Sequence, residues 1–260
     1  KVRRDLPTDL QIQASVGFRG ELPEALRDAT SDPVSAMGLV LAMVLRNQTE
    51  QREEQLKLAQ TLAGGEVVRV ALQLWPVLKQ SPGGYRVPLL DLALPTLRQL
   101  SPAQAEGFKS VLKQVGYHSG EDFVLLLIEA MMHRYWGVEV TSSGSNALNL
   151  AQAASLLLTA VVRTSSESME DRMAAYQRSL GVAGILGASP TMVADPLADL
   201  QKVSDALVVV MQADVNTRRN FVRACGVAVL FDNQVEPAEV EILRAISDAI
   251  GINFVTGLEH

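Results

Sequence analysis

The side chains that come closest to a known chemical pattern lie in one short acidic segment near the C-terminus. Asp232, Gln234 and Glu236 alternate along the chain, as the first ligands of an EF-hand calcium loop do. The pattern then fails, because Pro237 replaces the required glycine and Leu243 replaces the bidentate glutamate. The favoured interpretation is a helix junction, in which Glu236 caps a helix that Pro237 begins. The weak candidates for metal ligands are Asp232, Glu236 and Glu239.

Known catalytic sets are missing from the sequence. A hydrolytic zinc helix needs two histidines one turn apart and a glutamate base, and neither His118 nor His133 has them. Cys225 has no histidine near it in sequence, which favours a buried structural thiol. The glycines from Gly181 to Gly187 follow a predicted helix and lack the Lys-Ser/Thr of a phosphate loop. We therefore expect no catalytic residue, no cofactor-binding residue and no enzyme activity in this chain.

Two groups of residues could instead form surfaces. Arg218, Arg219 and Arg223 make a basic stripe on one predicted helix, which is typical of a solvated face, with an acidic partner as the alternative. Large aromatic residues at predicted helix ends are more often core residues than binding residues, although an exposed pair would indicate an interface. These aromatic residues are Trp75, Tyr85, Tyr135 and Trp136.

The composition disfavours several classes of function. The chain has 260 residues and a net charge of -6, so it lacks the excess of Lys and Arg that nucleic-acid binding requires. A single cysteine cannot form an internal disulfide, and it fits a reducing compartment. The longest apolar runs, Gly38 to Leu45 and Leu156 to Val162, are far shorter than the roughly 20 residues that cross a bilayer. The start, from Lys1 to Arg4, does not resemble a signal peptide.

Apolar residues recur at helical spacing along most of the chain, and no stretch has the sustained alternation of a sheet. The sequence predicts an all-α fold of roughly ten helices in an irregular multi-helical bundle, with two lobes that each contain a helical hairpin as one fitting arrangement. The expected division is a lead-in at 1–20, an N-terminal lobe at 21–137, a linker at 138–145, a C-terminal helical lobe at 146–256 and a tag remnant at 257–260, which includes His260.

Helix boundaries follow from caps and prolines. Asp32-Pro33, Ser101-Pro102 and Asp195-Pro196 each resemble a capping residue followed by a first-turn proline, and Thr49 is expected to cap another helix. Pro76 should kink or end the helix that contains it. The segment Tyr85 to Leu100 fits either two short helices or one helix that Pro88 begins and Pro95 bends.

The most regular stretch is the predicted hairpin from Thr217 to Ile252, whose second helix carries an apolar stripe. The stripe contains Val240, Ile242, Leu243, Ile246, Ala249 and Ile250. Phe108 to Trp136 also reads as a helix, an acidic turn and a helix. A duplicated hairpin is one interpretation, and the general likeness of any two helical hairpins is the other.

Three segments in order, Leu22 to Leu45, Val87 to Phe108 and Phe221 to Ile252, resemble the C-terminal helical region of bacterial membrane zinc metallopeptidases related to HtpX and the CaaX prenyl protease. The last segment also resembles a TerB-type (tellurite-resistance) helical module, in which an acidic turn joins two helices, so the resemblance implies that the lobe at 146–256 is TerB-like. The resemblance covers most of residues 20 to 252. It departs at His118 to Asp122 and at Asn233, where the family commonly has glycine, which weighs against a shared ion site.

This resemblance implies that the catalytic domain, its zinc and the membrane helices precede Lys1, so no catalytic residue carries over to this chain. The leading hypothesis is a non-catalytic, soluble accessory domain on the cytoplasmic face of the inner membrane, which binds a protein partner or protease substrate in grooves between helices. The alternative is a free-standing TerB-like ion- or stress-linked module that uses the acidic turn. An enzyme in its own right is a third, poorly supported reading.

Overall fold

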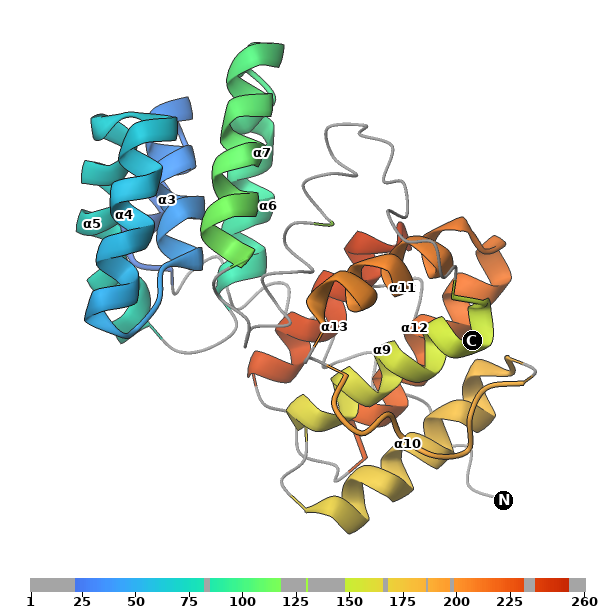
Figure 1. Ribbon diagram of the computed structural model, residues 1–260. Helices are drawn as coiled ribbons and strands as arrows, with labels where there is room; N and C mark the ends of the chain where they lie inside the picture. The colour runs from blue at the N-terminus through green and yellow to red at the C-terminus, as the bar shows by residue number, and fades with distance from the viewer. Residues whose placement is uncertain are drawn as a thin grey trace. The chain divides into compact units, whose positions relative to one another are not determined.

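The computed structural model describes residues 22–81, 85–117, 130, 148–165, 168–185, 187–196, 199–231 and 237–252. Within these ranges it contains eleven helices and no strand, which confirms the predicted all-α class (Figure 1). None of the described helices is both long and apolar enough to cross a membrane. The predicted linker at 138–145 and the second half of the first predicted hairpin lie outside the described ranges, apart from Ala130.

The chain divides into two compact units. We call Gly17–Leu125 the N-unit, and Leu126–His260 together with Lys1–Val16 the C-unit. The N-unit contains α2 (Glu24–Asp28), α3 (Pro33–Val44), α4 (Thr49–Ala63), α5 (Gly65–Gln80), α6 (Arg86–Leu97) and α7 (Pro102–Tyr117). The C-unit contains α9 (Leu150–Ser165), α10 (Met169–Ala183), α11 (Leu200–Gln212), α12 (Val215–Val229) and α13 (Pro237–Ala249).

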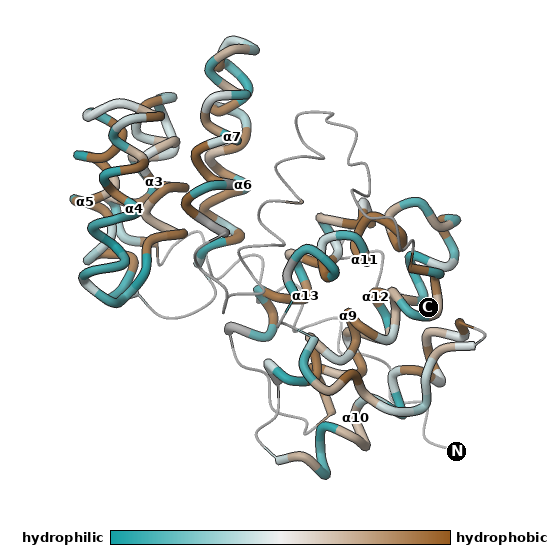
Figure 2. The backbone as a smooth tube through the Cα atoms, viewed as in Figure 1, coloured by the Kyte–Doolittle hydropathy of each residue, from teal (hydrophilic) through white to brown (hydrophobic). Residues whose placement is uncertain are grey.

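The N-unit is built around α3, whose apolar run from Gly38 to Leu45 is buried throughout. It packs most extensively against α5 and also against α6 and α7. A Cβ atom on Gly38 would lie 2.5 Å from Val70 Cγ1, so the missing side chain is what allows the two helices to approach so closely. In Figure 2, α3 is coloured mainly brown to white, whereas α4 on the outside of the unit carries much teal.

The C-unit has the same plan around α9, in which residues 153–162 are all buried. This helix packs against α10, α11, α12 and α13, and α10 and α12 also pack together. The predicted stripe on α13 is confirmed for Ile242, Leu243, Ile246, Ala249 and Ile250, all at most 4% exposed, whereas Val240 is only half-buried. The two longest apolar runs in the sequence are therefore the two central helices.

Of the predicted caps at Asp32, Thr49, Ser101 and Asp195, the first and third are confirmed, and the predicted cap Glu236 lies outside the described residues. The carboxylate of Asp32 accepts hydrogen bonds from the amides of Val34 and Ser35 at 3.1 and 3.0 Å. Ser101 and Gln104 form a reciprocal capping box, with Ser101 Oγ accepting from Gln104 N and Gln104 Oε1 accepting from Ser101 N.

The caps predicted at Thr49 and Asp195 are wrong. Gln48, and not Thr49, precedes the first turn of α4, and no side chain caps it. The helix expected at Asp195-Pro196 begins only at Leu200, where Asp199 caps it by accepting from Lys202 N at 3.1 Å. Asp195 instead faces Arg163, with 3.6 Å between the charged groups.

Neither Pro76 nor Pro95 ends the helix that contains it. Helix α5 continues through Pro76 to Gln80, so this proline does not end it. The proline leaves the carbonyl of Leu72 without its helical donor, and Leu72 itself is 49% exposed. For the Pro88 and Pro95 segment, the structure favours the single helix, since α6 runs from Arg86 to Leu97 with Pro88 in its first turn.

Candidate functional site

The acidic turn that could hold an ion is described only in part. Asp232 and Glu236 lie outside the described ranges, and Glu239 lies in the first turn of α13, where it is 5% exposed and interacts within the protein. Among the described residues, no group of three or more His, Cys, Asp and Glu side chains is placed to hold a metal. The proposed ion ligands therefore stay a prediction. His118, His133, Tyr135 and Trp136 also lie outside the described ranges.

The predicted basic stripe on α12 is divided by the structure. Arg218 is half-buried, and its Nη1 donates to the carbonyl of Ile250 at 2.9 Å, which ties the start of α12 to the residue after α13. Its Nε is buried and has no hydrogen-bond partner in the described part of the chain. Arg219 is exposed and Arg223 partly exposed, so only these two fit the interpretation of a solvated face.

The thiol of Cys225 is fully buried in the middle of α12, as predicted. Burial raises its pKa far above the ordinary value, because the charged thiolate would lose its hydration. The thiolate is the nucleophilic form of cysteine, so this environment suppresses reactivity at neutral pH.

In the N-unit, a polar junction joins the end of α3 to α4 and α7. Gln55 is 3% exposed, and its amide donates to the carbonyls of Val44 and Val115 at 3.1 and 2.9 Å. Its Oε1 accepts from Arg46 N at 2.8 Å. The sequence did not indicate this junction, since Gln55 lies among the charged residues of α4.

Beside that junction, the Arg52 guanidinium lies over the ring of Trp75, 4.1 Å from the ring centre, and it also donates to the carbonyls of Arg46 and Asn47. This arrangement fastens α4 to α5 and to the loop that precedes α4. Of the predicted aromatic core residues, Tyr85 is buried and Trp75 is partly exposed under the guanidinium.

The C-unit holds the least expected polar arrangement, a segment fixed across α9 and α10. We call residues 187–196 the strap. Ser155 Oγ accepts from Ser189 N at 3.0 Å, and Thr159 Oγ1 accepts from Val193 N at 3.2 Å. Arg163 donates to the carbonyl of Ala194. These three α9 residues follow one another at intervals of four, so they lie on one face of the helix.

Helix α10 adds one more bond to the strap. Tyr176, fully buried, donates its hydroxyl to the carbonyl of Ser189 at 2.9 Å. Burial raises the pKa of this phenol above its ordinary value, because the charged phenolate would lose its hydration. The spacing of Ser155, Thr159 and Arg163 within a mainly apolar helix is the one sequence signal that could have indicated the strap.

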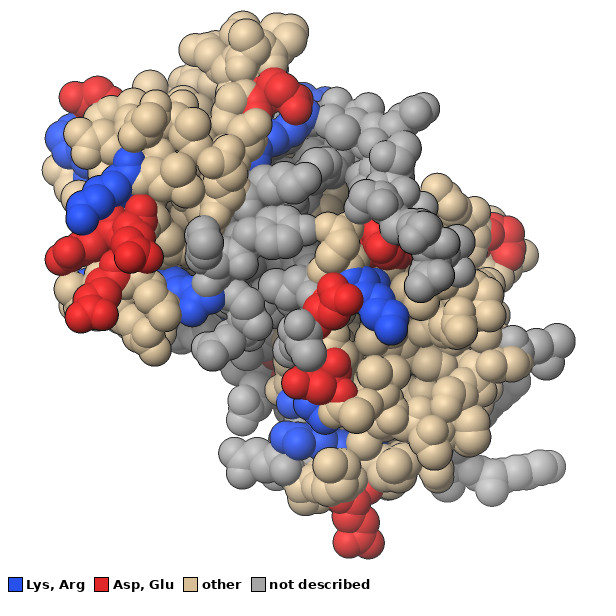
Figure 3. Space-filling view, viewed as in Figure 1, with Lys and Arg blue, Asp and Glu red and all other residues tan. Residues whose placement is uncertain are grey.

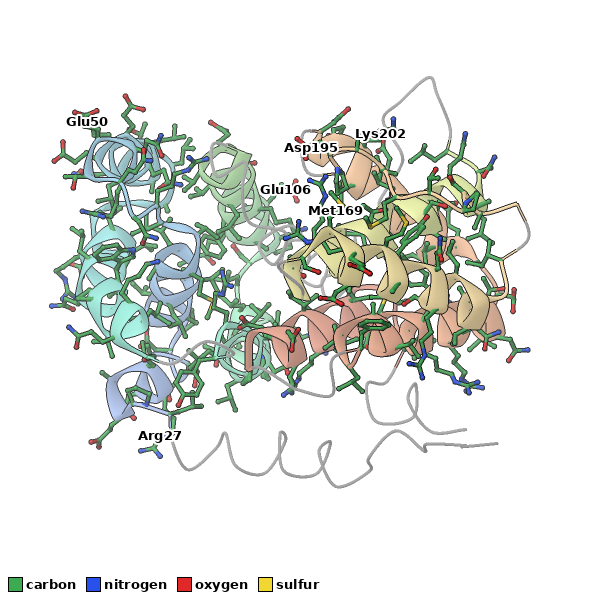
Figure 4. All side chains as sticks on the ribbon, turned by 90° about the horizontal axis from the view of Figure 1, so that it is seen from below. Arg27, Glu50, Glu106, Met169, Asp195 and Lys202 are labelled. Carbon is green, nitrogen blue, oxygen red and sulfur yellow. The ribbon has the colours of Figure 1, made fainter. Side chains whose placement is uncertain are left out.

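Charged side chains lie mainly at the periphery of both units. Arg27, Glu50, Glu106, Asp195 and Lys202, labelled in Figure 4, are all exposed, and so is Met169. On the face drawn in Figure 3, acidic side chains gather over α4 with basic side chains next to them.

Comparison with family models, with curated proteins and with solved structures finds no match for this chain.

Proposed function

We propose that this chain is a non-catalytic helical domain that binds protein segments and serves a bacterial membrane zinc metallopeptidase at the cytoplasmic face of the inner membrane. The resemblance of its three segments to that family supports the parent protein. In this proposal, zinc belongs to the catalytic domain of the parent, and this chain supplies no ligand to it.

The observation that carries the non-catalytic role is the use of the buried polar side chains. Those whose bonds are described all bond the main chain, which is what a scaffold requires. Thr30, Thr96, Ser155, Thr159, Ser179 and Ser247 each donate to a carbonyl, and Gln55 bonds three main-chain groups. Hydroxyls engaged in this way are poor candidates for nucleophiles, which need a neighbouring base instead.

For the binding role, the outer face of α5 offers an apolar position. Leu72 is 49% exposed, and Pro76, one turn further along the same helix, is also exposed. A partner helix or extended segment that packs on Leu72 would cover this side chain, in the manner of helix-in-groove recognition. We take the partner to be another segment of the parent protease or one of its substrates.

Site-specific photo-crosslinking in a bacterial host tests this role. A photoreactive residue at position 72 should give adducts that mass spectrometry identifies as the peptidase part of the parent protein or its substrates. The same residue at position 80, where Gln80 is exposed on the same helix, is the matched control. Equal adducts at the two positions, or none at 72, would contradict the proposal.

An activity assay tests the part of the proposal that says this chain is non-catalytic. The purified chain with added zinc should leave casein and peptide libraries intact. Cleavage that a chelator abolishes and that persists after a second purification step would show an enzyme instead.

A further inference from the structure

The strap is held almost entirely by its main chain. Ser155, Thr159 and Arg163 of α9 and Tyr176 of α10 together bind Ser189 N, Ser189 O, Val193 N and Ala194 O. A Cβ on Gly187 would lie 3.8 Å from that of Ala151, so the strap follows α9 from residue 151 to 163, about 18 Å along the helix axis. Main-chain recognition depends only weakly on the side chains of the segment that is bound.

Little apolar packing holds the strap in place. Of its ten residues, Pro196 alone is buried, and the other nine are exposed or half-buried. By contrast, the side chains of α9 and α10 beneath the strap are buried, since Ser155, Thr159 and Tyr176 are each at most 3% exposed. A segment held by a few hydrogen bonds and little burial opens at much lower cost than the unit unfolds. Opening would bare polar groups that are already arranged to bind a main chain.

The strap also carries its own turn. Ser189 Oγ accepts from Thr191 N at 3.2 Å, and Pro190 lies between these two residues. This turn shortens the segment from Ser189 to Val193, so that its two amides can reach Ser155 and Thr159, which are one helical turn apart on α9. The bound conformation is therefore a proline-containing turn flanked by two amides, Ser189 N and Val193 N, that donate to α9.

We propose that the α9–α10 face beneath the strap is a peptide-binding groove, that the strap occupies it as an internal competitor, and that a proline-turn segment of a partner protein displaces the strap. The inference rests on the proposed protein-binding function and names the surface and the kind of segment that it takes. Because the strap is tethered, it competes at an effective concentration in the millimolar range. Weakening the strap should therefore strengthen binding of an added peptide.

A fluorescein-labelled peptide with the sequence of residues 187–196 is the probe, and fluorescence anisotropy with the full chain is the measurement. Val193→Pro removes the amide that Thr159 binds while leaving α9 unchanged. We expect it to bind the peptide at least tenfold more tightly than the natural chain does. Val193→Ala, which keeps the amide, is the matched control and should bind no more than threefold more tightly.

A second set of variants tests the groove itself. Adding Thr159→Val to Val193→Pro should return binding to the level of the natural chain, because valine has the shape of threonine without its acceptor. Ser179→Ala, which removes a buried α10 hydroxyl bonded to Ala175 O, should have no such effect. Where Val193→Pro fails to fold, Asp195→Ala weakens the strap from its exposed end by removing the pair with Arg163.

Equal peptide binding by Val193→Pro and Val193→Ala would overturn the groove, and so would binding that survives Thr159→Val. Position 72 lies in the N-unit, so the crosslinking experiment is independent of the peptide-binding experiment. Peptide binding without those crosslinks would support the groove while removing the support for the accessory role. Crosslinks without peptide binding would do the reverse.

Discussion

Gln55 Nε2 donates to the carbonyl of Val115 at 2.9 Å, a contact between residues sixty positions apart in the chain. The same nitrogen binds the Val44 carbonyl, and Oε1 accepts from Arg46 N. One neutral side chain thus uses both donor protons and its acceptor to join α4 to the ends of α3 and α7. These main-chain groups lie beyond helix hydrogen bonding or near a helix end, where backbone groups need other partners.

Replacing Gln55 should therefore be costly. Gln55→Leu keeps the approximate volume and leaves two carbonyls and one amide without this partner, so we expect the free energy of unfolding to fall by about 3 kcal/mol. Urea denaturation followed by circular dichroism measures the change. Gln60→Leu, at an exposed position on the same helix, should change it by less than about 0.5 kcal/mol. Equal effects of the two substitutions would show that the hydrogen bonds of Gln55 do not contribute to the free energy of unfolding.

The contact between α3 and α5 gives a second expectation. An alanine at 38 would place its Cβ 2.5 Å from Val70 Cγ1 and 3.1 Å from Val67 O, so Gly38→Ala should destabilise the fold by about 1–3 kcal/mol. Gly107 also lies within a helix, but a Cβ there meets nothing within 4 Å. Gly107→Ala should raise stability by about 0.5–1 kcal/mol. Thermal unfolding of both variants is the measurement, and shifts in the same direction would contradict the close approach.

The cap of α3 predicts a dependence on pH. Hydrogen bonds from the side chain and amide of Ser35 lower the pKa of Asp32, so the charged carboxylate is favoured in the folded state. This contribution is present above the ordinary pKa of about 3.9 and is lost as the pH falls through the lower folded value. Asp32→Ala should cost about 1 kcal/mol at pH 7 and progressively less below pH 4.

Asp32→Asn is the control for the charge, because asparagine caps helices without titrating in this range. Its stability relative to the natural chain should be highest at low pH. A penalty for Asp32→Ala that is the same at pH 7 and pH 2.5 would contradict the assignment.

The acidic turn should not bind an ion tightly. Pro237 and Leu243 replace two required features of a calcium loop, and Glu239 is buried and already interacts within the protein. Isothermal titration calorimetry with millimolar calcium, magnesium or zinc should give no binding heat. Heat that disappears in the Asp232→Asn and Glu236→Gln variants would revive the TerB-like ion module.

Local features of the fold were predictable from the sequence, because they depend on neighbouring residues. Asp32 and Ser101 cap their helices with main-chain partners two or three residues away. The long apolar runs correctly marked buried helices. Asp195-Pro196 has the same local pattern as Asp32-Pro33, but the distant Arg163 pairs with Asp195 and the next helix begins later. A local cap pattern therefore does not show whether a distant charged residue, such as Arg163, pairs with the capping carboxylate instead.

The polar arrangements were not predictable, since their partners lie far apart in sequence. In the sequence, Gln55 resembles the other glutamines of α4, and only the folded structure places α7 beside it. Arg218 belonged to a predicted solvated stripe, yet it binds the carbonyl of Ile250. Ser155 and Thr159 bind the strap through residues 34 positions away. Sequence periodicity reports which face is apolar, and it carries no information about which distant backbone atom a polar side chain meets.

The order of synthesis gives the central helices a further consequence. Helix α3 leaves the ribosome before α5, α6 and α7, which cover it, and α9 leaves before α10 to α13. Each unit therefore exposes its most apolar stretch on the nascent chain until much later residues have been made. Translation of each unit passes through a stage at which a chaperone has an uncovered apolar stretch to bind.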